Sequence, residues 1–82
     1  MKIKIGGLYK LFNPRQKDAR EVGIRPINGP GVFIRINVGT LFLVIEKINT
    51  DNMDYTDYPM FLCLVGDKLY QIPQEYIGEL NV

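Results

Sequence analysis

The chain has 82 residues, of which 46% are hydrophobic and 23% charged, and its formal net charge is +1. A chain of this length and composition is typical of one folded domain, which we expect to span residues 1–82. The sequence contains no His, no Ser and a single Cys. This excludes Ser–His and Cys–His catalytic pairs, zinc frameworks built from Cys and His, and an internal disulfide. We therefore expect no cofactor, no metal site and no enzymatic activity.

The first residues alternate Lys and Ile up to Gly6-Gly7. They lack the apolar segment of about 7–15 residues that a secretory signal requires. No apolar run elsewhere approaches the roughly 18–20 residues of a membrane span. These features predict a protein of the cytoplasm that has no membrane partner.

In the first part of the chain, hydrophobic residues repeat with the period of two that is typical of strands. Residues 3–12 predict one bent strand or two short ones, broken at Gly6-Gly7. Residues 13–31 predict a long loop, which begins at Asn13-Pro14 and ends at Asn28-Gly29-Pro30-Gly31. Within it, residues 17–22 could form one helical turn, because Gly23 and Pro26 limit its length.

The remainder predicts short strands at 32–38, 41–48, 60–65, 69–72 and 77–82, with a turn at Gly39-Thr40 between the first two. In the strand 32–38, Phe33 and Arg35 are expected to face outward. Gly66-Asp67 is a two-residue hairpin signal with Gly at the first central position. Residues 73–76 suit a single tight helical turn. Residues 49–59 read as a polar loop, in which Asp51, Asp54 and Asp57 lack the spacing of a calcium loop.

These elements predict an all-β fold of five to six short strands. Because residues 41–48 and 60–65 are apolar on both faces, we expect the sheet to curl and close into a small barrel. Both strands carry more apolar side chains than a small barrel can enclose. One alternate set of each must therefore face outward, where the loop 13–31, a protein partner or a second copy would cover it.

Three segments resemble SH3 domains in order and spacing. Residues 71–77, Gln-Ile-Pro-Gln-Glu-Tyr-Ile, resemble the 3₁₀ turn before the last SH3 strand. Residues 7–11 are similar to the opening Ala-Leu-Tyr-Asp-Tyr segment, and residues 39–47 to the strand after the diverging turn. The resemblance implies an SH3-like barrel with a long first loop and one short 3₁₀ turn. The chain also resembles short single-domain proteins encoded by bacteriophages, which would place it in the host cytoplasm.

The resemblance departs from peptide-binding SH3 domains at two points. Met60-Phe61 stands near the position of the paired tryptophans, and the long first loop is basic rather than acidic. Only Tyr9, Pro73 and Tyr76 match a proline-peptide groove, so the resemblance implies the fold more than Pro-x-x-Pro binding.

Charge is divided unequally along the chain. Residues 1–40 carry eight basic and two acidic side chains, whereas residues 41–82 carry two basic and seven acidic ones. The basic half could meet phosphates or an acidic protein surface, or could face the acidic loop of its own chain. The residues expected to steer a charged partner or contact phosphate are Arg15, Lys17, Arg20 and Arg25.

Aromatic side chains supply the remaining candidates. Tyr and Phe beside Arg suit protein interfaces, and they also suit base stacking in nucleic-acid binders. The residues expected to bind a partner are Tyr9, Phe33, Arg35, Tyr55, Tyr58 and Tyr76. Cys63 stands in an apolar strand and is expected to be a buried, inert thiol with a raised pKa.

Together these features predict a non-enzymatic interaction module that binds another protein through its loops and an apolar-aromatic strand face. If the chain is phage-encoded, the partner would be a host protein. Two alternatives stay open: a nucleic-acid-associated barrel that uses the basic region 10–25, and a structural subunit of a larger assembly. A homo-oligomer is compatible with each of these functions.

Overall fold

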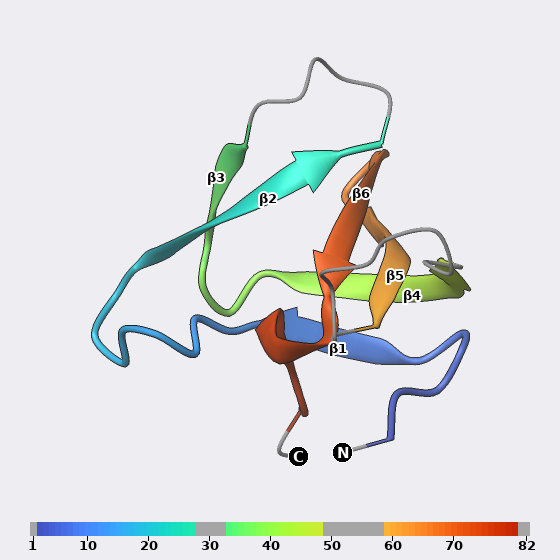
Figure 1. Ribbon diagram of the computed structural model, residues 1–82, viewed down its shortest axis with the longest axis horizontal. Helices are drawn as coiled ribbons and strands as arrows, with labels where there is room; N and C mark the ends of the chain where they lie inside the picture. Colours follow the sequence, from blue (N-terminus) through green and yellow to red (C-terminus); the bar gives the residue numbers. More distant parts are fainter. Residues whose placement is uncertain (1, 28–32, 49–58, 81–82) are drawn as a thin grey trace.

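The computed structural model describes residues 2–27, 33–48 and 59–80. They form seven strands and one 3₁₀ helix (Figure 1). In chain order these are β1 (Leu8–Leu11), β2 (Glu21–Pro26), β3 (Ile34–Asn37), β4 (Leu41–Ile48), β5 (Met60–Val65), β6 (Lys68–Pro73), η1 (Gln74–Tyr76) and β7 (Ile77–Gly78). This part of the chain contains no helix long and apolar enough to cross a membrane.

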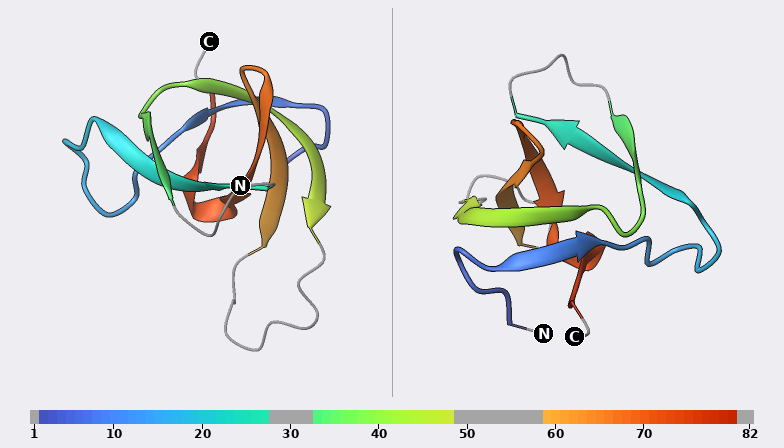
Figure 2. Two further views of the ribbon diagram at one scale, coloured as in Figure 1. Left: turned by 90° about the horizontal axis from the view of Figure 1, so that it is seen from above. Right: turned by 180° about the vertical axis from the view of Figure 1, so that it is seen from behind.

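All strand pairs are antiparallel, and the strands form one sheet in the order β3-β2-β6-β5-β4-β1-β7. The all-β prediction is confirmed, but the prediction of a closed barrel with five or six strands is wrong. The sheet curls without closing, because its end strands β3 and β7 are not paired with each other. Figure 2 shows the β2–β3 hairpin on one flank of the molecule and the β4–β5 pair on the opposite flank.

The core forms because every second residue of each long strand points to the same side of the sheet. Phe42 and Val44 of β4 are buried, and their neighbours Leu41 and Leu43 face outward. The same alternation buries one set of β5 and β6 side chains. Twelve residues make up this core: Tyr9, Leu11, Val22, Ile24, Phe42, Val44, Phe61, Cys63, Val65, Tyr70, Ile72 and Ile77.

Three predicted turns have the expected geometry. Gly66 has a φ of +65°, whereas no described residue other than Gly has a positive φ. The Gly66-Asp67 hairpin therefore follows the type II′ pattern, which fits the right-handed twist of β5 and β6. Gly39, with a φ of +91°, turns the chain between β3 and β4. Residues 74–76 form the predicted 3₁₀ turn.

The prediction of a loop over residues 13–31 is wrong, because β2 lies within it. The helical turn expected at 17–22 is also wrong. Val22 is buried in the core, and the carbonyl of Arg20 accepts a hydrogen bond from the Val38 N–H at 2.8 Å. Pairing with β3 and β6 therefore outweighs the weak helical preference of this segment.

The two ends of the chain also differ from expectation. Residues 2–7 form no strand, although the Val44 N–H donates to the Gly7 carbonyl at 3.0 Å and so extends the contact between β1 and β4. Gly6 has a φ of +83° and turns the chain at this point. The final strand is limited to Ile77–Gly78, and residues 81–82 of the predicted strand lie outside the described residues.

The alternation makes a prediction about stability. Leu11 on β1 is fully buried, whereas Leu41 on the neighbouring strand β4 is 51% exposed. Leu11→Ala should lower the free energy of unfolding by about 2–5 kcal/mol, since it leaves a cavity in the core. Leu41→Ala should change it by only about 0.5 kcal/mol. Urea denaturation of both variants measures the difference, and equal losses would contradict the assignment of the two faces.

Candidate functional site: the outer side of the β2–β3 hairpin

The β2–β3 hairpin presents its outer side to solvent. Its register pairs Val22 with Ile36 and Ile24 with Ile34, and the β2 members of both pairs are buried in the core. Because side chains alternate along a strand, the residues between them face outward. On β3 the outward set includes Arg35. By the same alternation Phe33, which directly precedes the strand, lies on this outer side.

Phe33 is the most exposed large hydrophobic side chain in the described residues, at 64%. An ideal Cβ placed on Gly23 would lie 3.4 Å from the Cβ of Phe33, so the phenyl side chain occupies the space beside this glycine. The Arg25 guanidinium carbon lies 5.2 Å from the centre of the phenyl ring, within the range of a cation–π contact. Arg25 and Phe33 therefore form one cationic and aromatic unit.

Two further arginines extend this unit. Arg35 lies directly across from Gly23 on β3. Arg20 and Arg35 line a shallow concavity of about 390 Å³, together with Gln16, Ala19, Glu21, Val22 and Gly23. We call Arg20, Arg25, Phe33 and Arg35 the arginine–phenylalanine face. Glu21 is the one acidic side chain of the two hairpin strands, so the face carries net positive charge.

The structure thus brings together four of the ten residues selected from the sequence. It places the others elsewhere. Arg15 and Lys17 are exposed on the segment between β1 and β2. The Arg15 N–H donates to the Asn13 Oδ1 at 3.0 Å in a local turn. Tyr55 and Tyr58 lie outside the described residues.

Tyr9 and Tyr76 contribute to the core rather than to an open surface. The Tyr9 side chain is 9% exposed, and its hydroxyl accepts a hydrogen bond from the Lys4 N–H at 2.8 Å. Tyr76 is half-buried and packs against the core from η1. Pro73 ends β6 and precedes η1. The ring of Tyr9 therefore offers little surface to a partner, and its expected partner-binding role stays a prediction.

A second exposed feature lies in the middle of the sheet. Leu8, Leu43, Leu64 and Leu69 are directly opposed across the neighbouring strands β1, β4, β5 and β6. We call these four residues the outer leucine row. Leu8 and Leu69 of this row are exposed, and so is Leu41, which lies on the same side of β4. The sequence left open which alternate set of β4 faces outward, and the structure assigns Leu41, Leu43 and Ile45 to the outside.

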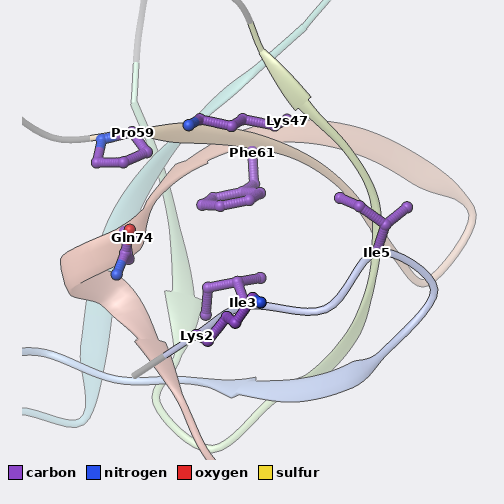
Figure 3. Close-up of a pocket in the computed structure, with 7 residues that line it drawn as sticks. All are labelled: Lys2, Ile3, Ile5, Lys47, Pro59, Phe61 and Gln74. Carbon is purple, nitrogen blue, oxygen red and sulfur yellow. The ribbon is translucent and has the colours of Figure 1, made fainter.

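A pocket of about 570 Å³ opens at the end of the sheet near the start of β5 (Figure 3). The Phe61 ring points into it, and Ile3 and Ile5 supply further apolar surface. Its other lining residues are Lys2, Lys47, Pro59 and Gln74. None of these side chains is a carboxylate, a thiol or a hydroxyl, so the pocket offers apolar contact and positive charge.

Among the described residues, no group of three or more Cys, Asp or Glu side chains could hold a metal ion. Cys63 is the single thiol and is fully buried, as expected. Its Sγ lies 3.7 Å from the carbonyl oxygen of Phe61. Burial raises the pKa of Cys63 from 9.0 to about 12, because the thiolate loses its hydration inside the core.

Comparison with known proteins found no matching family model, no matching curated protein and no matching solved structure.

The burial of Cys63 predicts low thiol reactivity. At pH 8 the folded chain should react with Ellman's reagent far more slowly than the urea-unfolded chain, because only the thiolate is nucleophilic. The unfolded thiol loses its proton near pH 9, whereas the folded thiol retains it to about pH 12. This thiol should therefore lower the free energy of unfolding as the pH rises through that interval. Equal labelling rates in the folded and unfolded chains would contradict the assignment.

Proposed function

We propose that this chain is a non-enzymatic interaction module that binds another protein through the arginine–phenylalanine face. The observation that carries the proposal is the 5.2 Å contact between Arg25 and the exposed ring of Phe33, with Arg35 beside it. Arginine and aromatic side chains dominate the binding energy of protein interfaces. An exposed phenyl ring already held by a guanidinium also loses little conformational freedom on binding.

The partner that suits this face carries acidic and apolar groups. A carboxylate could pair with Arg35 or Arg25, and an apolar side chain could cover the phenyl ring. Arginine forms bidentate hydrogen bonds with carboxylates, which adds orientation to the charge attraction. Charge complementarity of this kind mainly increases the association rate and the specificity.

An SH3-like arrangement is part of this proposal. The order of the strands, with a 3₁₀ turn before the last one, supports it. In that interpretation the β2–β3 hairpin corresponds to the long first loop, whose basic side chains would select acidic rather than basic ligands. A role in the cytoplasm of a phage-infected host, acting on a host protein, is consistent with the short single domain and rests on resemblance alone.

Charge reversal tests the face. We expect Arg25→Glu combined with Arg35→Glu to reduce recovery of the partner by at least about tenfold, since both guanidinium contacts become repulsive. Phe33→Ala should have a comparable effect. The measurement is a pull-down with the tagged chain from lysate of the source organism or its host, divided into nuclease-treated and untreated halves.

The matched control is Lys47→Glu combined with Lys68→Glu, which changes the net charge equally at two exposed positions outside the hairpin. This control should retain the partner. If both double variants lose it equally, the proposal fails, because general charge rather than this face would govern binding. Recovery that disappears with nuclease would instead support nucleic acid, for which Phe33 offers a stacking surface and the arginines phosphate contacts.

The outer leucine row supports a second candidate function, a structural subunit of a larger assembly. Exposed contiguous apolar surface on a sheet is typical of faces that neighbouring subunits cover. Leu8→Lys combined with Leu69→Lys should then prevent assembly, whereas reversal of Arg25 and Arg35 should not. Light scattering of the pure chain measures self-association through the same surface. A monomer that binds its partner normally with both leucines replaced would exclude this function.

A further inference from the structure

The backbone of β3 has hydrogen-bonding groups that point away from the sheet. Among the described strands, β3 pairs only with β2. The Val38 N–H donates to the Arg20 carbonyl at 2.8 Å, and this pair continues the register that joins Val22 to Ile36. In an antiparallel ladder, hydrogen-bonded and non-hydrogen-bonded pairs alternate. Arg35 belongs to a non-hydrogen-bonded pair, so its N–H and its carbonyl point toward the open edge.

The two sides of this edge differ in chemistry. On the outer side, Arg35 and Phe33 stand next to the edge, with Arg25 behind Phe33. On the core side stand Ile34 and Ile36. Ile34 is 40% exposed, although its partner on β2, Ile24, is buried. The edge therefore offers positive charge on one side and uncovered apolar surface on the other.

Resting on the proposed protein-binding function, we infer that the partner binds by adding an extended strand to β3. An antiparallel strand would exchange two backbone hydrogen bonds with Arg35, as in known strand-addition complexes. Directly opposed residues share a face of the sheet. The residue opposite Arg35 is therefore Asp or Glu, and the residues before and after it, opposite Ile34 and Ile36, are apolar. The partner carries the pattern apolar–acidic–apolar in a segment free to become extended.

Charge and edge geometry favour this occupant over a basic strand. A Lys or Arg opposite Arg35 would place two like-charged side chains side by side on Cα atoms about 5.5 Å apart, the usual spacing of hydrogen-bonded pairs, with Arg25 close by. An acidic residue there instead completes a charge pair next to the phenyl ring. Arg35 also protects the free protein, because charged side chains on an edge strand oppose unspecific strand pairing.

The test uses a synthetic probe, the peptide acetyl-Ser-Thr-Val-Glu-Val-Thr-Ser-amide, titrated into the ¹⁵N-labelled chain. We expect the amide signals of Arg35 and its neighbours on β3 to shift, and the Arg35 amide to become protected from hydrogen exchange. Replacement of the peptide Glu by Lys should weaken binding by at least about tenfold. A peptide with the same Glu N-methylated should lose binding similarly, because it retains the charge but cannot donate to the Arg35 carbonyl.

Reversal of both charges of the pair, on Arg35 and on the peptide, distinguishes a charge effect from a loss of folding. Arg35→Glu should lose the Glu peptide and gain the Lys peptide, whereas Lys47→Glu should bind the Glu peptide normally. Equal binding of the N-methylated peptide would overturn strand addition, and so would shifts confined to the outer leucine row. A dimer in the absence of peptide, with β3 signals that change on dilution, would assign the edge to a second copy and overturn the inference.

Failure of strand addition and failure of the proposed function give different results. If the pull-down depends on Arg25 and Arg35 but the N-methylated peptide binds as well as the parent, the face binds protein without an added strand. If the pull-down is insensitive to the hairpin variants, the proposed function fails whatever the peptide does. If the chain binds an oligothymidylate but not the peptide, the same arginines contact nucleic acid, and the inference of strand addition is overturned.

Discussion

The burial of one side of each strand in a single core is the constraint on which the rest of the structure depends. Leu11, Val44, Cys63 and Ile72 come from four neighbouring strands and are fully buried. Since strands alternate, burial of these residues forces the intervening ones outward. The outer leucine row is the direct consequence on β1, β4, β5 and β6.

The same constraint positions the candidate site. Val22 and Ile24 extend the core onto β2, and β2 is held beside β6 by the pairing of Arg25 with Gln71 and by the Ile27 N–H, which donates to the Leu69 carbonyl at 3.1 Å. The hairpin is therefore part of the sheet, and its polar side must face solvent. Because β3 lies at the end of the sheet, one edge of its backbone is left without a partner among the described strands, and this is the edge we propose for strand addition. Arg35 on β3 limits unspecific pairing there.

The candidate site could be predicted only as a set of residue types. The exposure of Phe33 and Arg35 on one face follows from the alternation of that segment. The contribution of Arg25 does not, because the sequence assigned it to a loop, and only the register between β2 and β3 brings it to the Phe33 ring. Tyr9 is the opposite case, because its burial could not be predicted from its sequence context. Its sequence context suggested a binding residue, yet the fold needs its ring in the core and its hydroxyl at the Lys4 N–H.

The sequence by itself determined the local features: the short apolar strands 41–48 and 60–65, the hairpin at Gly66-Asp67, the turn at Gly39 and the 3₁₀ turn before the last strand. These depend on short apolar runs bounded by turn residues and on backbone preferences within a few residues. Tertiary structure alone decided that β2 is a strand, which face of β4 is buried, and that the sheet remains open. Each of these depends on hydrogen bonds or packing between segments far apart in the chain, and local preference carries no information about such partners.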